Sequence, residues 1–366
     1  MKKVLVILVL TGFILSGCLH KLSENGNTPE TIVPIDEEII ETDELQVKSL
    51  TVDQSKFHFI GGWLSNTEIL FIEKALNIYS VKTFDLESGE VETLHEDTSI
   101  IVDVLIHPTR EHILLHTTNN PSSAIIKLLS IDGAVRDEII VESSELSIEW
   151  NDLDPALILL TAFHQDWTFD LFLYNGNEEI FGLIDIEEPF PKWYGLDKVL
   201  TGFNEGHPLD GDNLKIYDID TDTSTFSDLT NIVYFDTYGE SILVVHIDET
   251  NDAVYSIMNL DGTISTQWTM SAVSNYSEWV FPEMAWVSEN TIFVQSPEGG
   301  GQLDELTGSY RLIRVVEGEQ EVLGEEFTPT LLRCSPDGEK CLTGYAGEHL
   351  INTITEEMTT WLKFSE

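Results

Sequence analysis

A strand–turn–strand motif repeats along this chain, and the spacing of its copies limits the folds that the chain can adopt. In the clearest copy, residues 331–342, two apolar runs flank the turn Ser-Pro-Asp-Gly at residues 335–338. Proline at the second position and glycine at the fourth suit the backbone angles of a tight turn. The motif recurs every 42 to 51 residues, with the first strand ending at residues 63, 106, 150, 193, 235, 286 and 334.

A second hairpin follows the first in each copy, so every copy supplies four short strands. Asp132-Gly133 is an example of the turn signals between the apolar runs. Apolar residues on both faces of the strands suit sheets that are buried between neighbouring sheets. Four-stranded units at this period predict an all-β fold, a β-propeller of seven four-stranded blades, with six blades as the alternative. In the second copy the strands are expected at residues 101–106, 113–116, 124–131 and 135–141.

Aromatic residues end the first strand in most copies. Because the position is repeated, we expect these side chains to pack between neighbouring blades. The alternative is an aromatic platform for a sugar. The tryptophans at this position are Trp63, Trp150, Trp193 and Trp286.

Residues 1–17 have the features of a lipoprotein signal peptide. Two lysines precede an apolar stretch at residues 4–15, which is too short to span a bilayer as a stable helix. The next residues, Leu-Ser-Gly-Cys, resemble the bacterial lipobox, in which the cysteine becomes the first residue and carries acyl chains such as palmitate. The sequence therefore predicts lipidation of Cys18, and the alternative is an ordinary secretory signal with an incidental cysteine.

Polar and acidic residues fill the stretch after this cysteine. Residues 18–47 contain two prolines and the acidic run Asp36-Glu37-Glu38. This composition predicts a flexible tether, and residues 48–366 are predicted to form the propeller domain.

The other two cysteines of the chain are Cys334 and Cys341, on either side of the turn at residues 335–338. Facing strands would place them directly opposite or diagonally across the hairpin, depending on the turn type. We predict a disulfide between them because the expected compartment is oxidising. Two buried thiols in the last blade are the alternative.

Acidic residues strongly outnumber basic ones. The chain has 18 Lys and Arg against 65 Asp and Glu, which gives a formal charge of −47. Such a chain should be repelled by nucleic acid and by anionic lipid headgroups, so nucleic-acid binding is a poor hypothesis. The recurring apolar residues argue against disorder and place the charge on a solvated surface.

Taken together, the lipobox at Cys18, the acidic tether and the degenerate blades resemble the YqgU-like β-propeller lipoproteins of Gram-positive bacteria, over essentially the whole chain. The turn at residues 335–338 also resembles the repeats of TolB-type propellers. The YqgU-like propellers are described as six-bladed, whereas the repeat count gives seven. The two blade counts would agree if the first or last copy were incomplete, or if residues 47–52 paired into the closing blade. The resemblance implies no particular chemistry.

Two groups of residues have the types and spacing of metal ligands. Asp218, Asp220 and Asp222 place carboxylates at alternate positions, as a Ca²⁺ loop requires. Thr223 replaces the glycine of such a loop, however, and an ordinary solvated hairpin turn is the simpler interpretation.

Three histidines, His107, His112 and His116, form the second group. Metal ligation is one interpretation, and packed or rim histidines are the simpler one. The sequence contains no nucleophile elbow, phosphate-binding glycine loop or nicotinamide fingerprint. We therefore predict no catalytic residues and no cofactor other than the Ca²⁺ candidate.

These features predict a membrane-anchored extracytoplasmic propeller that binds another component of the cell envelope, either a protein or the cell wall, and is monomeric. Its acidic surface would favour a basic partner. Two alternatives remain: a hydrolase or lyase that acts on cell-wall glycan or peptide at the propeller's centre, and a sensor of a small ligand or metal. Fold alone does not distinguish among them.

Overall fold

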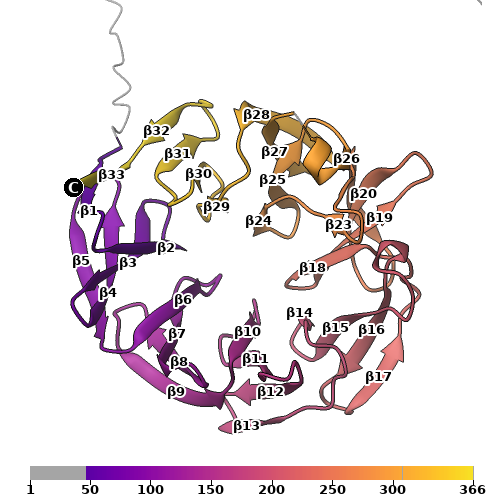
Figure 1. Ribbon diagram of the computed structural model, residues 1–366, viewed down its shortest axis with the longest axis horizontal. Coiled ribbons are helices and arrows are strands. Elements are labelled where there is room, and N and C mark those ends of the chain that lie inside the picture. The colour runs from indigo at the N-terminus through magenta and orange to yellow at the C-terminus, as the bar shows by residue number, and fades with distance from the viewer. Residues whose placement is uncertain (1–46, 307, 366) are drawn as a thin grey trace, which may run out of the picture. The chain divides into compact units, whose positions relative to one another are not determined.

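Seven four-stranded antiparallel sheets form the blades of a ring in the computed structural model (Figure 1). The structure describes residues 47–306 and 308–365, so the predicted signal peptide, lipidated Cys18 and nearly all of the tether lie outside the described residues. Residues Leu45–Glu366 form one compact unit. The predicted all-β propeller is confirmed, with the seven blades that the repeat count gives.

Each blade takes its four strands in sequence order, and the first strand lies nearest the centre of the ring (Figure 1). In the second blade the strands begin and end within a few residues of their predicted limits, except that the second continues to Asn120. The strands of the first four blades are β2 (Phe57–Trp63), β3 (Glu68–Ala75), β4 (Ile78–Asp85) and β5 (Val91–Asp97); β6 (Ile100–Ile106), β7 (His112–Asn120), β8 (Ser123–Ser130) and β9 (Val135–Glu142); β10 (Glu145–Trp150), β11 (Leu157–Phe163), β12 (Phe169–Asn175) and β13 (Ile180–Leu183); and β14 (Lys192–Tyr194), β15 (Lys198–Phe203), β16 (Asn213–Asp218) and β17 (Thr223–Phe226).

The last three blades follow the same order, with one small sheet inserted between the fifth and sixth. That sheet has three short strands in the order β23 (Trp279–Val280), β22 (Val273–Ser274) and β26 (Gly301–Gln302), and it includes Gly301, the last of three consecutive glycines. The strands of the last three blades are β18 (Tyr234–Tyr238), β19 (Ser241–Ile247), β20 (Asp252–Met258) and β21 (Ile264–Ser271); β24 (Met284–Ser288), β25 (Thr291–Pro297), β27 (Tyr310–Val316) and β28 (Glu319–Phe327); and β29 (Arg333–Cys334), β30 (Lys340–Thr343), β31 (His349–Asn352) and β32 (Met358–Thr360). The remaining elements are β1 (Leu50–Asp53), β22 (Val273–Ser274), β23 (Trp279–Val280), β26 (Gly301–Gln302), β33 (Leu362–Ser365) and the 3₁₀ helices η1 (Pro208–Asp210) and η2 (Leu303–Glu305).

The hydrophobic core is divided among the interfaces between blades. Seven clusters of buried residues each join two consecutive blades, and the seventh joins the last blade to the first. Strand β3 shows why both faces of a strand are apolar. Ile69 and Phe71 pack toward the last blade, whereas Leu70 and Ile72 pack toward the second. A sheet with neighbours on both sides needs apolar side chains at consecutive positions.

The ring closes where the two ends of the described chain meet. Strand β1 pairs in parallel with β33, with Leu50 opposite Leu362. Val52 and Leu362 belong to the same buried cluster as residues of the first and last blades. The pair is a separate two-stranded sheet, and it does not enter the closing blade as a further strand. No helix among the described residues has the length and apolar composition needed to cross a membrane.

Candidate functional site

Tryptophans at the ends of the first strands tie neighbouring blades together. The Trp63 indole nitrogen donates to the Arg333 carbonyl at 2.9 Å, and that of Trp193 donates to the Glu149 carbonyl at 3.1 Å. Both side chains are buried, so the packing role predicted for them is confirmed. Trp286 is half-buried, and its indole donates to the Asp236 carboxylate at 3.0 Å.

Charged side chains of three consecutive blades meet at the centre of the ring. Lys192 on β14 places its Nζ 3.2 Å from Glu149 Oε2 on β10 and 3.1 Å from Asp236 Oδ1 on β18. Figure 1 shows these three strands facing the centre of the ring. We call Glu149, Lys192 and Asp236 the lysine triad. It contains two acidic groups and one basic group, and Lys192 contacts both carboxylates.

Burial shapes the electrostatics of this region. It raises the pKa of Glu149 to about 7 against the opposing pull of Lys192, and the nearby charge of Asp236 acts in the same direction as burial. Burial also raises the pKa of Asp152 to about 6, although the Gly239 amide donates to its carboxylate. The two carboxylates of the lysine triad more than offset burial and raise the pKa of Lys192. The lysine is therefore charged at neutral pH, and Glu149 is partly protonated.

A cavity of about 320 Å³ lies among the innermost strands β2, β6, β24 and β29. We call it the central cavity. Two of its lining residues are arginines from different blades, Arg110 in the turn after β6 and Arg333 on β29. Glu283, just before β24, also lines it. The other side chains around it are mostly apolar, and they include Leu105, Ile106, Met284, Trp286 and Leu332.

A second, larger cavity of about 740 Å³ lies between the second and third blades. We call it the groove. The turn between β7 and β8 and the start of β10 line it, and Asp103 and Glu145 contribute its carboxylates. Ile100 and Val102 are nearly half exposed there. Apolar side chains, amides and two acidic groups together suit an extended peptide with apolar and basic residues.

Exposed aromatic side chains adjoin the groove. Trp167, in the turn between β11 and β12, is 84% exposed, and Phe190 is 64% exposed. The Phe163 ring lies 5.7 Å from that of Phe190, and Phe163 pairs across the strands with Glu145 of the groove. We call Phe163, Phe169, Trp167 and Phe190 the aromatic patch. Single exposed apolar residues are ordinary, but a cluster beside a groove is typical of an interaction surface.

The groove and the aromatic patch share one side of the ring, which carries the turns between the second and third strands of the blades. The described chain starts on the other side. There the Lys48 amide donates to the carbonyl of Leu86, in the turn between β4 and β5. A partner that docks on the groove would therefore not meet the segment through which the chain enters the propeller.

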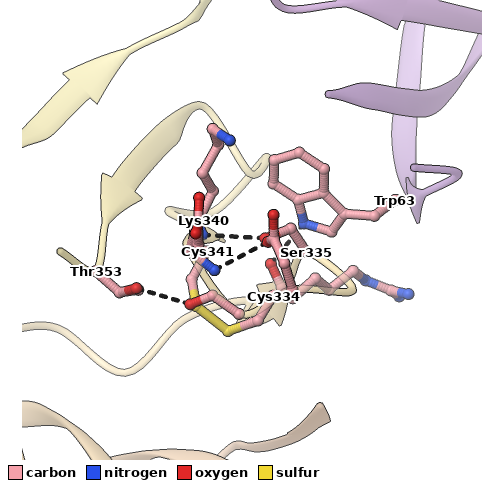
Figure 2. The surroundings of a disulfide bond; sticks show 10 residues. Trp63, Cys334, Ser335, Lys340, Cys341 and Thr353 are labelled. Carbon is pink, nitrogen blue, oxygen red and sulfur yellow. Dashed lines mark hydrogen bonds between the residues drawn. A yellow bond between two sulfur atoms is a disulfide. The ribbon is translucent and has the colours of Figure 1, made fainter. Parts of the chain in front are cut away.

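Cys334 and Cys341 are bonded to each other in the structure, and they lie directly opposite on β29 and β30 (Figure 2). Of the two arrangements that the sequence left open, the structure has the direct one. Figure 2 also shows Trp63 of the first blade beside this hairpin of the last blade. The bond therefore holds the strand that carries Arg333 and that receives the tryptophan's hydrogen bond.

The calcium candidates are spread around a turn of the fourth blade. Asp218 accepts hydrogen bonds from the amide and hydroxyl of Thr221, and these bonds lower its pKa. Asp222 accepts from the Tyr217 hydroxyl at 2.5 Å. The structure does not bring Asp218, Asp220 and Asp222 together around one point. No group of three His, Cys, Asp or Glu residues suited to a metal is found in the described part of the chain.

The three histidines of the second blade have separate surroundings. His107 is fully buried, with one ring nitrogen 2.9 Å from the Thr109 hydroxyl and the other 2.9 Å from the Asn151 carbonyl. Burial lowers its pKa and that of His116, which lines the groove. His107 and His112 have rings 6.2 Å apart, so they pack against each other. His107 thus has a structural role that joins the second blade to the third.

Comparisons with known proteins agree with this architecture. Residues 85–344 match the family described as the YqgU-like 6-bladed beta propeller domain. The chain is also 24% identical over 295 residues to the uncharacterized lipoprotein YqgU of Bacillus subtilis, covering 79% of this chain and 80% of that protein. The matched segment begins at the last residue of β4 and ends after β30, so it contains five complete blades and parts of two others.

Solved structures show the same fold at low sequence identity. An uncharacterized protein from Listeria monocytogenes EGD-e superposes with a TM-score of 0.79 at 18% identity, covering 87% of this chain and 98% of that one. The β-propeller domain of the Trilobed protease from Pyrococcus furiosus gives a TM-score of 0.54 at 14% identity, covering 84% and 97%. At these identities the likeness concerns the fold alone.

Proposed function

Because the chain belongs to the YqgU-like six-bladed β-propeller family, we propose that it is a lipid-anchored extracytoplasmic propeller that binds another component of the cell envelope. The relative in Bacillus subtilis is a lipoprotein by name, and the lipobox at Cys18 of this chain agrees with such an anchor. Two acyl chains hold a protein at a bilayer firmly, whereas one does so only weakly. The anchor would keep the ring close to the membrane.

The exposed aromatic patch beside the groove is the observation that carries the binding role. Trp167 sits at a turn where its backbone has a left-handed φ of 67°, which a bulky side chain adopts at some cost. The side chain is almost fully exposed, so it gains little from packing within the chain. Tryptophan is enriched among the residues that contribute most of the binding energy at protein interfaces. The rigid blades keep the patch and the groove in fixed positions.

The charge of this surface indicates the chemistry of the partner. Asp103 and Glu145 line the groove, and the whole chain carries a formal charge of −47. We expect a basic polypeptide segment with apolar residues, drawn to the groove by the field of the propeller. Its affinity should fall as salt is added, because salt screens charges that lie more than about 10 Å apart at 0.1 M.

Crosslinking in intact cells tests this function. A photoreactive amino acid is placed at Trp167 and, as a matched control, at Leu196, which is 54% exposed in the turn after β14. We expect one reproducible protein adduct from position 167, lost when Asp103 and Glu145 are changed to Asn and Gln, and none from position 196. Equal adducts from both positions would count against the groove as the binding surface.

The same experiment addresses the alternative of wall binding. If position 167 becomes linked only to cell-wall fragments, the groove is a binding surface but the proposal of a protein partner is wrong. If neither position gives an adduct in the cells that produce the chain, the binding role itself fails.

A further inference from the structure

Two arginines of the central cavity have no acidic partner among the described residues. The other three arginines of the chain, Arg136, Arg311 and Arg314, each lie within 4.0 Å of a carboxylate. Arg110 and Arg333 do not, although the chain has 65 acidic residues against 18 basic ones. The Nε atoms of both, like that of Arg311, are buried and have no hydrogen-bond partner in the part of the chain that the structure describes. Arg110 and Arg333 differ from Arg311 in having no carboxylate within ion-pair distance. With so many carboxylates available, unpaired guanidinium groups call for an explanation.

The two guanidinium groups come from the blades on either side of the first blade and converge on its innermost strand. Arg110 Nη1 donates to the Trp63 carbonyl at 2.6 Å, and Arg333 Nη1 donates to the Gly61 carbonyl at 3.0 Å. These acceptors are two residues apart on β2. Gly62 lies between them, and a Cβ added there would come within 3.7 Å of Arg333 Nη1. The absence of a side chain at Gly62 therefore leaves open the space beside that guanidinium.

Both arginines are half-buried, and removing part of a guanidinium from water without a counter-charge carries a cost. Burial accordingly lowers the pKa of both Arg110 and Arg333. Asp103 and Glu283 act on Arg333 only from beyond ion-pair distance. A ligand carboxylate in the central cavity would supply the missing charge, because the planar fork of a guanidinium matches a carboxylate. A phosphate dianion fits less well, since Glu283 in the cavity lining and the strongly acidic chain would repel it.

We propose that the central cavity binds a small zwitterion, an amino acid or a short peptide, with its carboxylate on Arg110 and Arg333 and its ammonium group on Glu283. Glu283 lines the same cavity, is exposed and forms no ion pair with the described residues. Apolar side chains such as Leu105 and Leu332 would contact the body of the ligand. The volume of about 320 Å³ lies at the small end of the range for ligand pockets. This site is distinct from the groove, so it goes beyond the partner binding proposed above.

Isothermal titration of the full-length chain in detergent tests the proposal with three matched probes. L-alanyl-L-alanine carries both charges, its N-acetyl derivative carries only the carboxylate, and its amide carries only the ammonium group. We expect the free dipeptide to bind most tightly, the N-acetyl form about tenfold more weakly and the amide not measurably. Failure of the free dipeptide to bind, or binding of inorganic phosphate in its place, would overturn the assignment.

Substitutions of Arg110, Arg333 and Glu283 test whether these side chains bind the dipeptide. Arg110→Gln and Arg333→Gln should each raise the dissociation constant of the dipeptide about tenfold or more, whereas Arg136→Gln, which removes an exposed arginine of the second blade, should leave it unchanged. Glu283→Gln provides a test that does not depend on the folding of the arginine variants, because the exposed Glu283 side chain forms no hydrogen bond or ion pair with the residues that the structure describes. This variant should bind the free and N-acetyl dipeptides equally. A preference as large as that of the unaltered chain would contradict the proposal.

Discussion

Replacing Trp63 with alanine is expected to lower the free energy of unfolding by about 3–5 kcal/mol. The side chain is 2% exposed and belongs to the cluster that joins the first and last blades. Its indole also donates to the Arg333 carbonyl at 2.9 Å. The substitution therefore leaves a cavity and an unpaired carbonyl at the point where the ring closes. Chemical denaturation followed by tryptophan fluorescence and circular dichroism would measure the change.

Trp167→Ala is the matched control for this prediction. It also removes a tryptophan, but its side chain is 84% exposed and lies outside every buried cluster. We expect a change within about 0.5 kcal/mol. If the two variants were equally stable, Trp63 could not be closing the ring as the structure indicates.

Lys192→Met should lower the free energy of unfolding by about 2 kcal/mol at pH 8. The lysine lies between Glu149 and Asp236, so its loss leaves two carboxylates close together without a counter-charge. Breaking a fully buried pair costs about 3–5 kcal/mol, and the smaller value allows for the 34% exposure of the Lys192 side chain. Lys56→Met, which removes a surface pair with Asp53, is the control and should change stability by less than about 1 kcal/mol.

The effect of Lys192→Met should depend on pH. Burial raises the pKa of Glu149 from 4.5 to about 7 in the folded chain. A carboxyl group with a raised pKa favours the folded state at low pH, and this contribution is lost as the pH rises through about 7. Without Lys192 the pKa of Glu149 would rise further, so the variant should approach the unaltered chain near pH 5 and differ most near pH 8. A difference that is the same at both pH values would contradict this role.

The repeated features of the sequence were sufficient to predict the fold. Each blade has the same apolar strands and turns at a period that only a few architectures share, and the repetition compensates for the weak signal of any single strand. The packing of Trp63 followed from the same argument, because a residue repeated at each blade interface serves packing first. The β22-β23-β26 sheet was missed, since strands of two or three residues have no periodicity to detect.

The centre of the ring was not predicted, and the reason lies in how a closed ring brings distant residues together. Arg110 and Arg333 converge on one strand only because the last blade packs on the first. Part of the lysine triad could have been predicted from the sequence, because Lys192 follows Glu149 by 43 residues, which is one repeat. Opposite charges one repeat apart fall on neighbouring blades, so a search for such pairs would have found them.

The proposed function requires the propeller to lie on the outer side of the membrane, because the lipid anchor and an accessible envelope partner both depend on that position. Labelling intact cells with a lysine reagent that cannot cross membranes tests it directly, since Lys56 is 53% exposed. We expect the membrane-bound chain to be labelled as fully in intact cells as after lysis. A chain that is protected in intact cells and labelled only after lysis would lie inside the cell, and the proposed function would be wrong.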